Sequence, residues 1–175
     1  MKKILLALVL IISTAFAGFS QKYAFVDTEY ILKNIPEYND AQSLLDDMAS
    51  EWQNEIEEKY TEIDQLYKSY QAEAVLLPEE MKKKREDEII KKEQGVKELQ
   101  RQRFGKDGDL FKKRQELIKP IQEKIYNAIE EMATQQNYAI IFDKAGSLSM
   151  LYANEKYDLS DDVLSKLGYS YDSNK

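Results

Sequence analysis

The chain has 175 residues, 33% of them charged, with a formal net charge of −7 and a pI near 4.9. An acidic chain repels phosphate backbones, which argues against nucleic acid as a partner. The sequence contains no histidine and no cysteine, so it lacks the commonest general base, thiol nucleophiles, the usual zinc ligands and any disulfide. We therefore expect a protein that is not an enzyme and that uses no metal or cofactor.

Residues 1–20 have the pattern of a secretory signal peptide. A basic pair, Lys2 and Lys3, precedes an unbroken apolar run over 4–12, and Ala15-Phe16-Ala17 fits a small-x-small cleavage site. The apolar run is shorter than the roughly 20 residues that a transmembrane helix needs. We expect cleavage after Ala17 or after Ser20, with no stable membrane insertion afterwards.

The segment after the signal predicts a strand and then a short helix. Tyr23–Val26 has the composition of a short buried strand. Asp27 or Thr28 can cap a helical turn that runs to Asn34. Ile35 precedes a proline and so disfavours the α region, which places a boundary before Pro36.

A long helix is predicted from Pro36, because proline suits a first-turn position. Apolar and aromatic residues recur along it with a mean step of 3.6, the period of a single helical stripe, and the later part is heptad-like. The stripe consists of Ala41, Leu45, Met48, Trp52, Ile56, Tyr60, Ile63, Tyr67, Tyr70, Ala74 and Leu77.

A second long helix is predicted from Pro78, with Glu79 and Glu80 at its positive end. Pro36 and Pro120 each lie 42 positions from Pro78, so the chain is expected to run out along one helix and back along another of equal length. The apolar face of the return helix comprises Met81, Ile89, Val96, Leu99, Phe104, Phe111, Leu117 and Ile118.

Two glycines interrupt the pattern of the return helix. We interpret Gly105 and Gly108 as glycines tolerated inside the helix, and as a possible arm hinge, since each loosens a helix by about 1 kcal/mol. The basic run 82–85 lies between acidic residues, which favours a solvated, salt-bridged face over a phosphate site.

The C-terminal third predicts mixed structure. A helix continues beyond Pro120, and Tyr138–Asp143 is apolar on both faces, as in a strand buried twice over. We expect Leu148–Tyr152 to pair with it in a β-hairpin. Ser160 is expected to cap a short helix that ends at Gly168.

The predicted fold class is mostly α with a small β element. A long antiparallel helical hairpin, the coiled-coil arm 37–119, is expected to project from a small α/β oligomerisation body formed by 21–36 and 120–175, all within one domain 21–175. So little surface is buried by a thin hairpin and a few short strands that a lone chain would be marginally stable. An oligomer is therefore expected, joined through Phe25, Val26, Ile140, Ile141 and Leu151.

Two carboxylates raise the question of catalysis. Asp27 and Asp143 both end predicted strands and could face each other as a pair. Capping roles are favoured, because no other catalytic group accompanies them.

The order of these segments resembles the Skp (OmpH-like) family of periplasmic chaperones over essentially the whole chain after the signal. The residues that carry the resemblance are Tyr23–Asp27, the long charged hairpin, Lys119–Ile121, Ala128–Ile129, Asn137–Asp143 and Asp158–Leu164. The resemblance implies a homotrimer whose hairpins enclose a cavity that holds unfolded outer-membrane proteins without ATP. The best-known members are strongly basic, whereas this chain is acidic, so the charge argues against electrostatic capture of clients or lipopolysaccharide.

Two functions follow from this interpretation. The first is an ATP-independent periplasmic holdase for unfolded outer-membrane proteins. The second is a structural coiled-coil envelope adaptor that binds one specific partner. The candidate client-binding residues lie toward the hairpin tip: Tyr60, Tyr67, Tyr70, Leu76, Leu77 and Met81. Tyrosine and methionine offer adaptable contact area. For the stripe as a whole, packing between the two helices is the favoured role, and the tip residues are expected to be its exposed minority.

Overall fold

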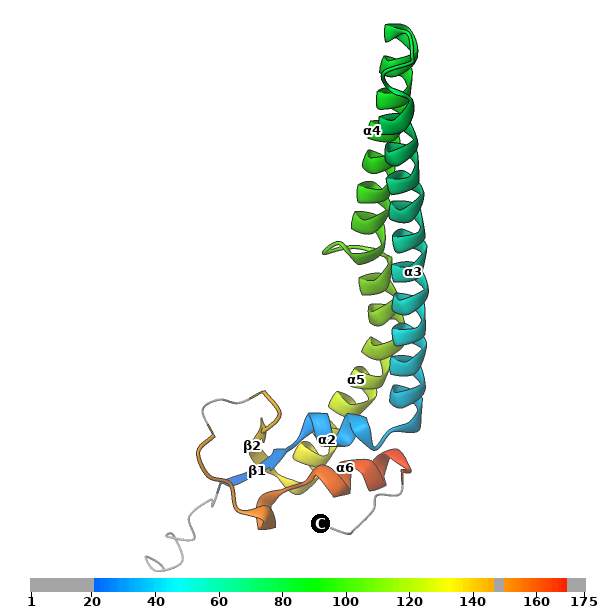
Figure 1. The fold of residues 1–175 in the computed structure, drawn as a ribbon. Coiled ribbons are helices and arrows are strands. Elements are labelled where there is room, and N and C mark those ends of the chain that lie inside the picture. Colours follow the sequence, from blue (N-terminus) through cyan, green and yellow to red (C-terminus); the bar gives the residue numbers. More distant parts are fainter. Residues whose placement is uncertain (1–20, 147–149, 170–175) are drawn as a thin grey trace, which may run out of the picture. The chain divides into compact units, whose positions relative to one another are not determined.

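A computed structural model describes residues 21–146 and 150–169 (Figure 1). It confirms the predicted fold class: long helices with one small sheet. The predicted signal peptide lies outside the described residues. The elements in order are β1 (Lys22–Val26), α2 (Thr28–Lys33), α3 (Pro36–Glu73), α4 (Glu79–Phe104), α5 (Asp109–Gln136), β2 (Tyr138–Asp143), a 3-10 turn (Glu155–Tyr157) and α6 (Ser160–Leu167).

The chain divides into two compact units. Residues 35–124 form one, which we call the hairpin unit, and the described residues on either side form the other, which we call the terminal unit. Helix α5 contributes its first part to the hairpin unit and its remainder to the terminal unit. None of the helices within the described ranges is both long and apolar enough to cross a membrane.

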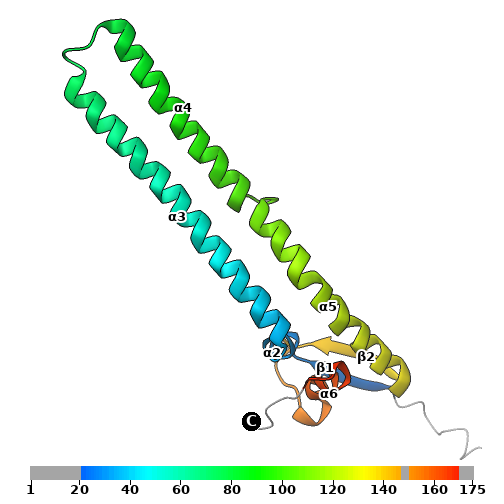
Figure 2. The ribbon, with the colours of Figure 1, turned by 90° about the vertical axis from the view of Figure 1, so that its right-hand side faces the viewer.

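The hairpin unit is built on two antiparallel helices, α3 and α4, which lie side by side (Figures 1 and 2). Pro36 is in the first turn of α3, as predicted, and Pro78 caps α4 with two glutamates following in its first turn. The core between the helices consists of Ile56, Ile63, Ile89 and Val96, all buried, with Leu66, Tyr70, Leu99 and Phe104 packed against them. Each buried aliphatic side chain contributes about 1.5–3 kcal/mol.

A second cluster lies where the first part of α5 packs on the start of α3. It joins Ala41 and Leu45 to Ile118, with Tyr38, Leu110 and Leu117 partly buried around them. Part of the apolar stripe predicted along α3 therefore packs against the return segment in both halves of the hairpin unit, namely Ala41, Leu45, Ile56, Ile63 and Tyr70.

The return segment is not the single helix that the sequence predicted. Helix α4 ends at Phe104 with Gly105 as its cap, and α5 begins at Asp109. The interpretation of Gly105 and Gly108 as helix-interior glycines is therefore wrong. The physical reason is a close backbone approach: a Cβ on Gly105 would lie 2.3 Å from the Arg101 carbonyl oxygen, and one on Gly108 would lie 2.7 Å from that of Gln102. In contrast, α5 runs without interruption through Pro120.

The terminal unit contains a two-stranded parallel sheet. Strand β1 pairs with β2 in a register that sets Tyr23 against Ile140 and Phe25 against Phe142. The predicted β-hairpin is wrong, because β2 pairs with β1 instead, and residues 150–154 form no strand. Part of its predicted partner, 147–149, lies outside the described residues.

Strand β2 is not buried on both faces in this chain. Ile140 is 47% exposed and Phe142 is 48% exposed. The apolar sequence of β2 predicts burial of both its faces. In the described part of the chain the sheet has only two strands, and the face that carries Ile140 and Phe142 stays about half exposed.

The core of the terminal unit forms between the short helices. Ile31 of α2 and Leu164 of α6 are fully buried, and α2 packs against α6. Two polar contacts hold the helices in place: the Tyr30 hydroxyl donates to Asp161 Oδ1 at 2.9 Å, and Lys166 Nζ lies 2.8 Å from Glu131 Oε2 on α5.

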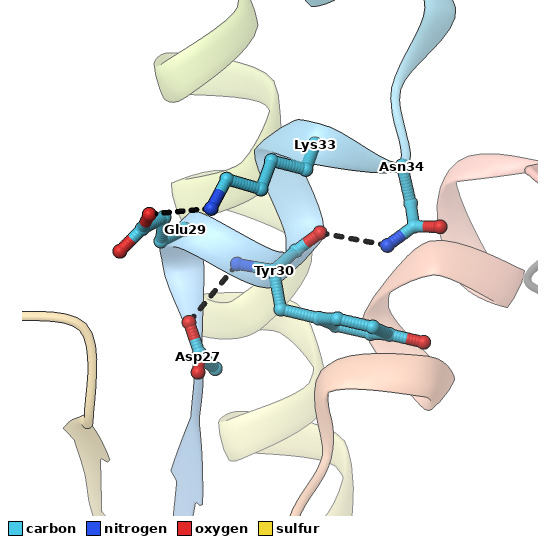
Figure 3. Close-up of polar contacts among 5 residues, drawn as sticks. All are labelled: Asp27, Glu29, Tyr30, Lys33 and Asn34. Atoms are coloured by element: carbon cyan, nitrogen blue, oxygen red, sulfur yellow. Dashed lines mark hydrogen bonds and ion pairs between the residues drawn. The ribbon is translucent and has the colours of Figure 1, made fainter. Parts of the chain in front are cut away.

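Helix α2 is short, and its ends are satisfied by side chains (Figure 3). Asp27 caps the N-terminus by accepting from the Tyr30 amide at 2.9 Å. The Asn34 side chain donates to the Tyr30 carbonyl at 2.9 Å, and Lys33 bridges to Glu29 at 2.6 Å. The predicted helical turn is confirmed, and of its two candidate caps, Asp27 and Thr28, Asp27 is the one that caps it.

Helix α6 differs slightly from its prediction. Leu159 is the capping residue and Ser160 is the first helical one, so the assignment of Ser160 as the cap is wrong. The Ser160 hydroxyl is engaged elsewhere: it donates to Asp158 Oδ1 at 2.5 Å and accepts from the Asp27 amide at 2.8 Å. Gly168 ends the helix with φ of +87°, a left-handed conformation that favours glycine.

Candidate functional site

The two strand-end carboxylates serve as backbone caps. Asp27 accepts from the Tyr30 amide. Asp143 accepts from the Thr28 amide at 3.2 Å, from the Thr28 hydroxyl at 2.7 Å and from the Ala145 amide at 3.0 Å. Their oxygens hold the turns after β1 and β2, as strand-end and cap roles require.

An open groove lies in the terminal unit, with a volume of about 1120 Å³. It runs along β1 and β2 and the segment 150–157. We call it the aromatic groove, because most of its large side chains are aromatic. Its apolar lining comprises Tyr23, Ala24, Phe25, Tyr138, Phe142, Met150, Leu151, Tyr152, Ala153 and Tyr157.

The exposure of the groove residues is high for apolar side chains. Leu151 is 98% exposed and Tyr152 is 82% exposed. The outer edge of β2 pairs with no other strand in the described part of the chain. A contiguous apolar surface beside an unpaired strand edge is typical of a surface that another polypeptide covers.

The five residues predicted to join an oligomer fall into two groups. Ile140 and Leu151 are exposed and Ile141 is half-buried. Phe25 and Val26 are 5% and 2% exposed, so they pack chiefly in the core of the terminal unit. Tyr152 and Phe142 are exposed beside them and were not predicted, although both lie in segments that the sequence marked as apolar strands.

The tip of the hairpin unit is a second exposed apolar surface. Val75 and Leu76 are 90% and 85% exposed in the turn between α3 and α4, and Met81 is 42% exposed at the start of α4. We call these three residues the tip surface. Val75 was not predicted, because it lies off the helical stripe; its only signal was its place next to Leu76-Leu77-Pro78.

The remaining candidate client-binding residues differ among themselves. Tyr60 and Tyr67 are 40% and 49% exposed along α3, and Leu77 is half-buried. Tyr70 instead packs against the hairpin core, and its hydroxyl donates to Glu86 Oε1 at 2.5 Å. That hydrogen bond to Glu86 raises the pKa of Tyr70 above its ordinary value.

Charges around the tip are balanced. Lys82 Nζ lies 2.7 Å from Glu79 Oε1, and Arg85 Nη1 lies 3.7 Å from Glu88 Oε2. Lys82 and Arg85 of the basic run 82–85 therefore form ion pairs on an exposed helix face. Such pairs leave little net field to attract a charged ligand, so the chemistry that the tip surface offers is apolar.

Residues 22–167 match the family described as Outer membrane protein (OmpH-like). The chain belongs to the OmpH-like family. An uncharacterized protein of Aquifex aeolicus (strain VF5) is 31% identical to this OmpH-like chain over 156 residues, covering 88% of the chain and 91% of the relative.

The same fold occurs in a crystal structure from Caulobacter crescentus CB15, provisionally described as that of an outer membrane chaperone (OmpH-like). Its TM-score to this OmpH-like chain is 0.67, at 12% sequence identity, and the match covers 86% of each chain. At that identity the likeness establishes the fold. It shows that a long hairpin and a small mixed unit form together despite very different side chains.

Proposed function

We propose that this OmpH-like protein is an ATP-independent holdase chaperone that binds unfolded outer-membrane proteins. The observation that carries the proposal is the family match over residues 22–167, and the Caulobacter crescentus protein of the same fold, provisionally described as an outer membrane chaperone, supports it. The residue types agree, because a chain without histidine or cysteine suits binding better than catalysis.

The proposed assembly is a homotrimer formed through the aromatic groove. Exposed Ile140, Phe142 and Leu151 would be covered by the same surface of neighbouring copies, and the free edge of β2 would gain a partner. Assembly would bring several hairpins together around one space. An unfolded client held in that space cannot meet another exposed client, so aggregation is suppressed without nucleotide.

Binding is proposed to depend on apolar contact. The tip surface offers mobile aliphatic and thioether groups, which suit many weak contacts with varied sequences. Loss of the first twenty residues would leave 23 basic residues against 32 acidic, a net charge of −9. Client affinity should therefore change little when salt shortens the Debye length below about 8 Å, whereas Coulombic capture would weaken steeply.

The protein is proposed to act in the periplasm after export. The basic, apolar and small-residue pattern of 1–20 supports this. Mass analysis of the protein from envelope fractions should give an N-terminus within residues 18–21. An intact Met1 there would contradict export by signal cleavage.

The direct test is light scattering while a denatured barrel protein is diluted from urea. Full-length mature protein should suppress scattering without ATP. A variant in which a short turn replaces Tyr60–Arg101 should keep three chains per particle and lose protection. Equal protection by both proteins would contradict the cavity mechanism.

Two smaller variants locate the contact surface. Val75→Ser with Leu76→Ser removes the apolar part of the tip surface and should weaken protection. Ile90→Ser is the control, because Ile90 is an exposed aliphatic on α4, at 49%, that lies outside the tip surface. Absence of protection by the unaltered protein, against several unrelated unfolded barrels, would favour an envelope adaptor with one specific partner.

A further inference from the structure

The interruption between α4 and α5 is a compact four-residue excursion (Figure 2). The Gly105 amide donates to the Arg101 carbonyl at 2.8 Å, and the Gly108 amide donates to the Gly105 carbonyl at 2.9 Å. Helix α5 then starts with the Lys112 amide donating to the Gly108 carbonyl at 3.0 Å. Backbone groups on both sides are thus hydrogen-bonded, and the loop has a defined geometry.

The excursion sets the register between α3 and the return segment. Trp52 packs edge-on against Phe104, with ring centroids 6.2 Å apart, and Ile118 clusters with Leu45 and Ala41. Trp52 and Ala41 are 11 positions apart on α3, whereas Phe104 and Ile118 are 14 apart. With the four residues 105–108 left out of the helix, the second spacing falls to 10, within one position of the first.

A second register is available to the same sequence. Ile89, Val96, Arg103, Leu110 and Leu117 are spaced by seven, so in a continuous helix they would line one face. Four residues are close to one helical turn of 3.6. Their entry into the helix would slide α5 along α3 by about 6 Å with little rotation.

Arg103 distinguishes the two registers. Its guanidinium carbon lies 4.6 Å from the centroid of the Trp52 ring, and Nη1 lies 2.8 Å from Asp109 Oδ2. Nη2 lies 3.9 Å from Glu55 Oε2. In a continuous helix, residues six apart point in different directions, so the ion pair between Arg103 and Asp109 can form only when 105–108 are looped out.

We propose that residues 105–108 are a register switch in the hairpin, held in its looped-out state by Arg103 bound to Trp52, Asp109 and Glu55. Release of Arg103 lets the four residues enter the helix and moves α5 one turn along α3. The two glycines favour the looped state, because each closely approaches a carbonyl oxygen of α4 where a Cβ would clash. Arg103 is a positioning residue in this device.

The test uses spin-label distances in the full mature protein. The sequence contains no cysteine, so labels can be placed at Gln65→Cys with Gln115→Cys, a pair that spans the switch. Gln65→Cys with Gln100→Cys lies on one side of it and serves as the reference pair. All three labelled positions are exposed, and labelled chains are diluted into an excess of unlabelled ones.

Gly105→Ala combined with Gly108→Ala should replace the spanning distance by one longer by about 6 Å, and Arg103→Gln should populate both distances. The reference distance should stay unchanged in every variant. Arg101→Gln is the matched control, because Arg101 pairs with Glu98 within α4 in either register. An unchanged spanning distance in both switch variants, or equal changes in both pairs, would overturn the proposal.

Discussion

The hairpin unit and the terminal unit bury their apolar side chains to different extents. In the hairpin unit, Ile56, Ile63, Ile89 and Val96 are all less than 8% exposed, because two amphipathic helices cover each other. In the terminal unit, β2 has an apolar sequence but leaves Ile140 and Phe142 about half exposed. One unit completes its core within the chain, and the other presents an apolar surface that the described residues do not cover.

The difference follows from the geometry of the elements. A helical hairpin needs only one partner face, and its turn supplies that partner. A strand has two faces and two edges, so a sheet of only two strands leaves apolar surface and hydrogen-bonding groups available. Stability of the terminal unit should therefore depend on protein concentration, whereas packing inside the hairpin should not.

The largest effect is expected where the terminal unit is proposed to meet its copies. Ile140→Asp would place an unpaired carboxylate in the interface, at a cost of about 3–5 kcal/mol. Association should weaken by at least about a hundredfold, which sedimentation or light scattering would measure. Ile90→Asp, an equally exposed aliphatic on α4, should leave the mass unchanged. If both variants keep the same oligomer, the β2 face is not the interface.

A core truncation in the hairpin sharpens the contrast. Ile63→Ala should destabilise the packing of α3 on α4 by about 2–5 kcal/mol, since it removes a buried aliphatic and leaves a cavity. Hydrogen exchange in α3 and α4 should accelerate while the oligomeric mass stays the same. Leu44→Ala, at a 49% exposed position on α3, is the control. A loss of assembly with Ile63→Ala would show that the units are not independent in this respect.

A smaller effect is expected at the cap of α2 in the terminal unit. Asp27→Ala removes the acceptor of the Tyr30 amide and should cost about 0.5–2 kcal/mol. Glu29→Ala breaks only an exposed ion pair with Lys33 and should cost at most about 0.5 kcal/mol. Thermal unfolding of the two variants at one protein concentration would measure the difference. Equal losses would contradict the capping role.

The smallest effect concerns alkaline pH near the tip of the hairpin. The hydrogen bond to Glu86 raises the pKa of Tyr70, so its stabilising contribution is present below the unfolded pKa of about 10 and is lost as pH rises through the folded value. Ultraviolet titration of the unaltered protein minus Tyr70→Phe should show a tyrosine that ionises late. Glu86→Gln should lower that pKa, and no change would exclude Glu86 as its cause.

The helices could be predicted from the sequence, because the residues that indicate their starts and their apolar faces lie within the helices themselves. Pro36, Pro78 and a stripe of mean period 3.6 fix where α3 and α4 begin and which faces meet. The interruption at 105–108 could not be predicted from the sequence. Positions 89, 96, 103, 110 and 117 are seven apart in the sequence whether or not four residues loop out. The looped-out state is visible in the structure, where α4 ends at Phe104, α5 begins at Asp109, and Arg103 contacts Trp52 and Asp109.

The strand pairing was harder to predict. An apolar run such as Tyr138–Asp143 predicts a buried strand but does not show which strand pairs with it. Its true partner, β1, lies more than a hundred residues earlier in the chain, whereas sequence proximity favoured Leu148–Tyr152. The candidate client-binding residues were found as a stripe, but exposure separates Leu76 from Tyr70, and exposure depends on tertiary packing.

The most direct measurement is the mass of the mature protein in solution over a range of micromolar concentrations. If the aromatic groove and the face of β2 are covered by copies of the chain, light scattering should give three chains per particle. Dilution should produce monomers whose terminal unit loses hydrogen-exchange protection while α3 and α4 keep theirs. A stable monomer with a fully protected terminal unit at micromolar concentration would contradict the account.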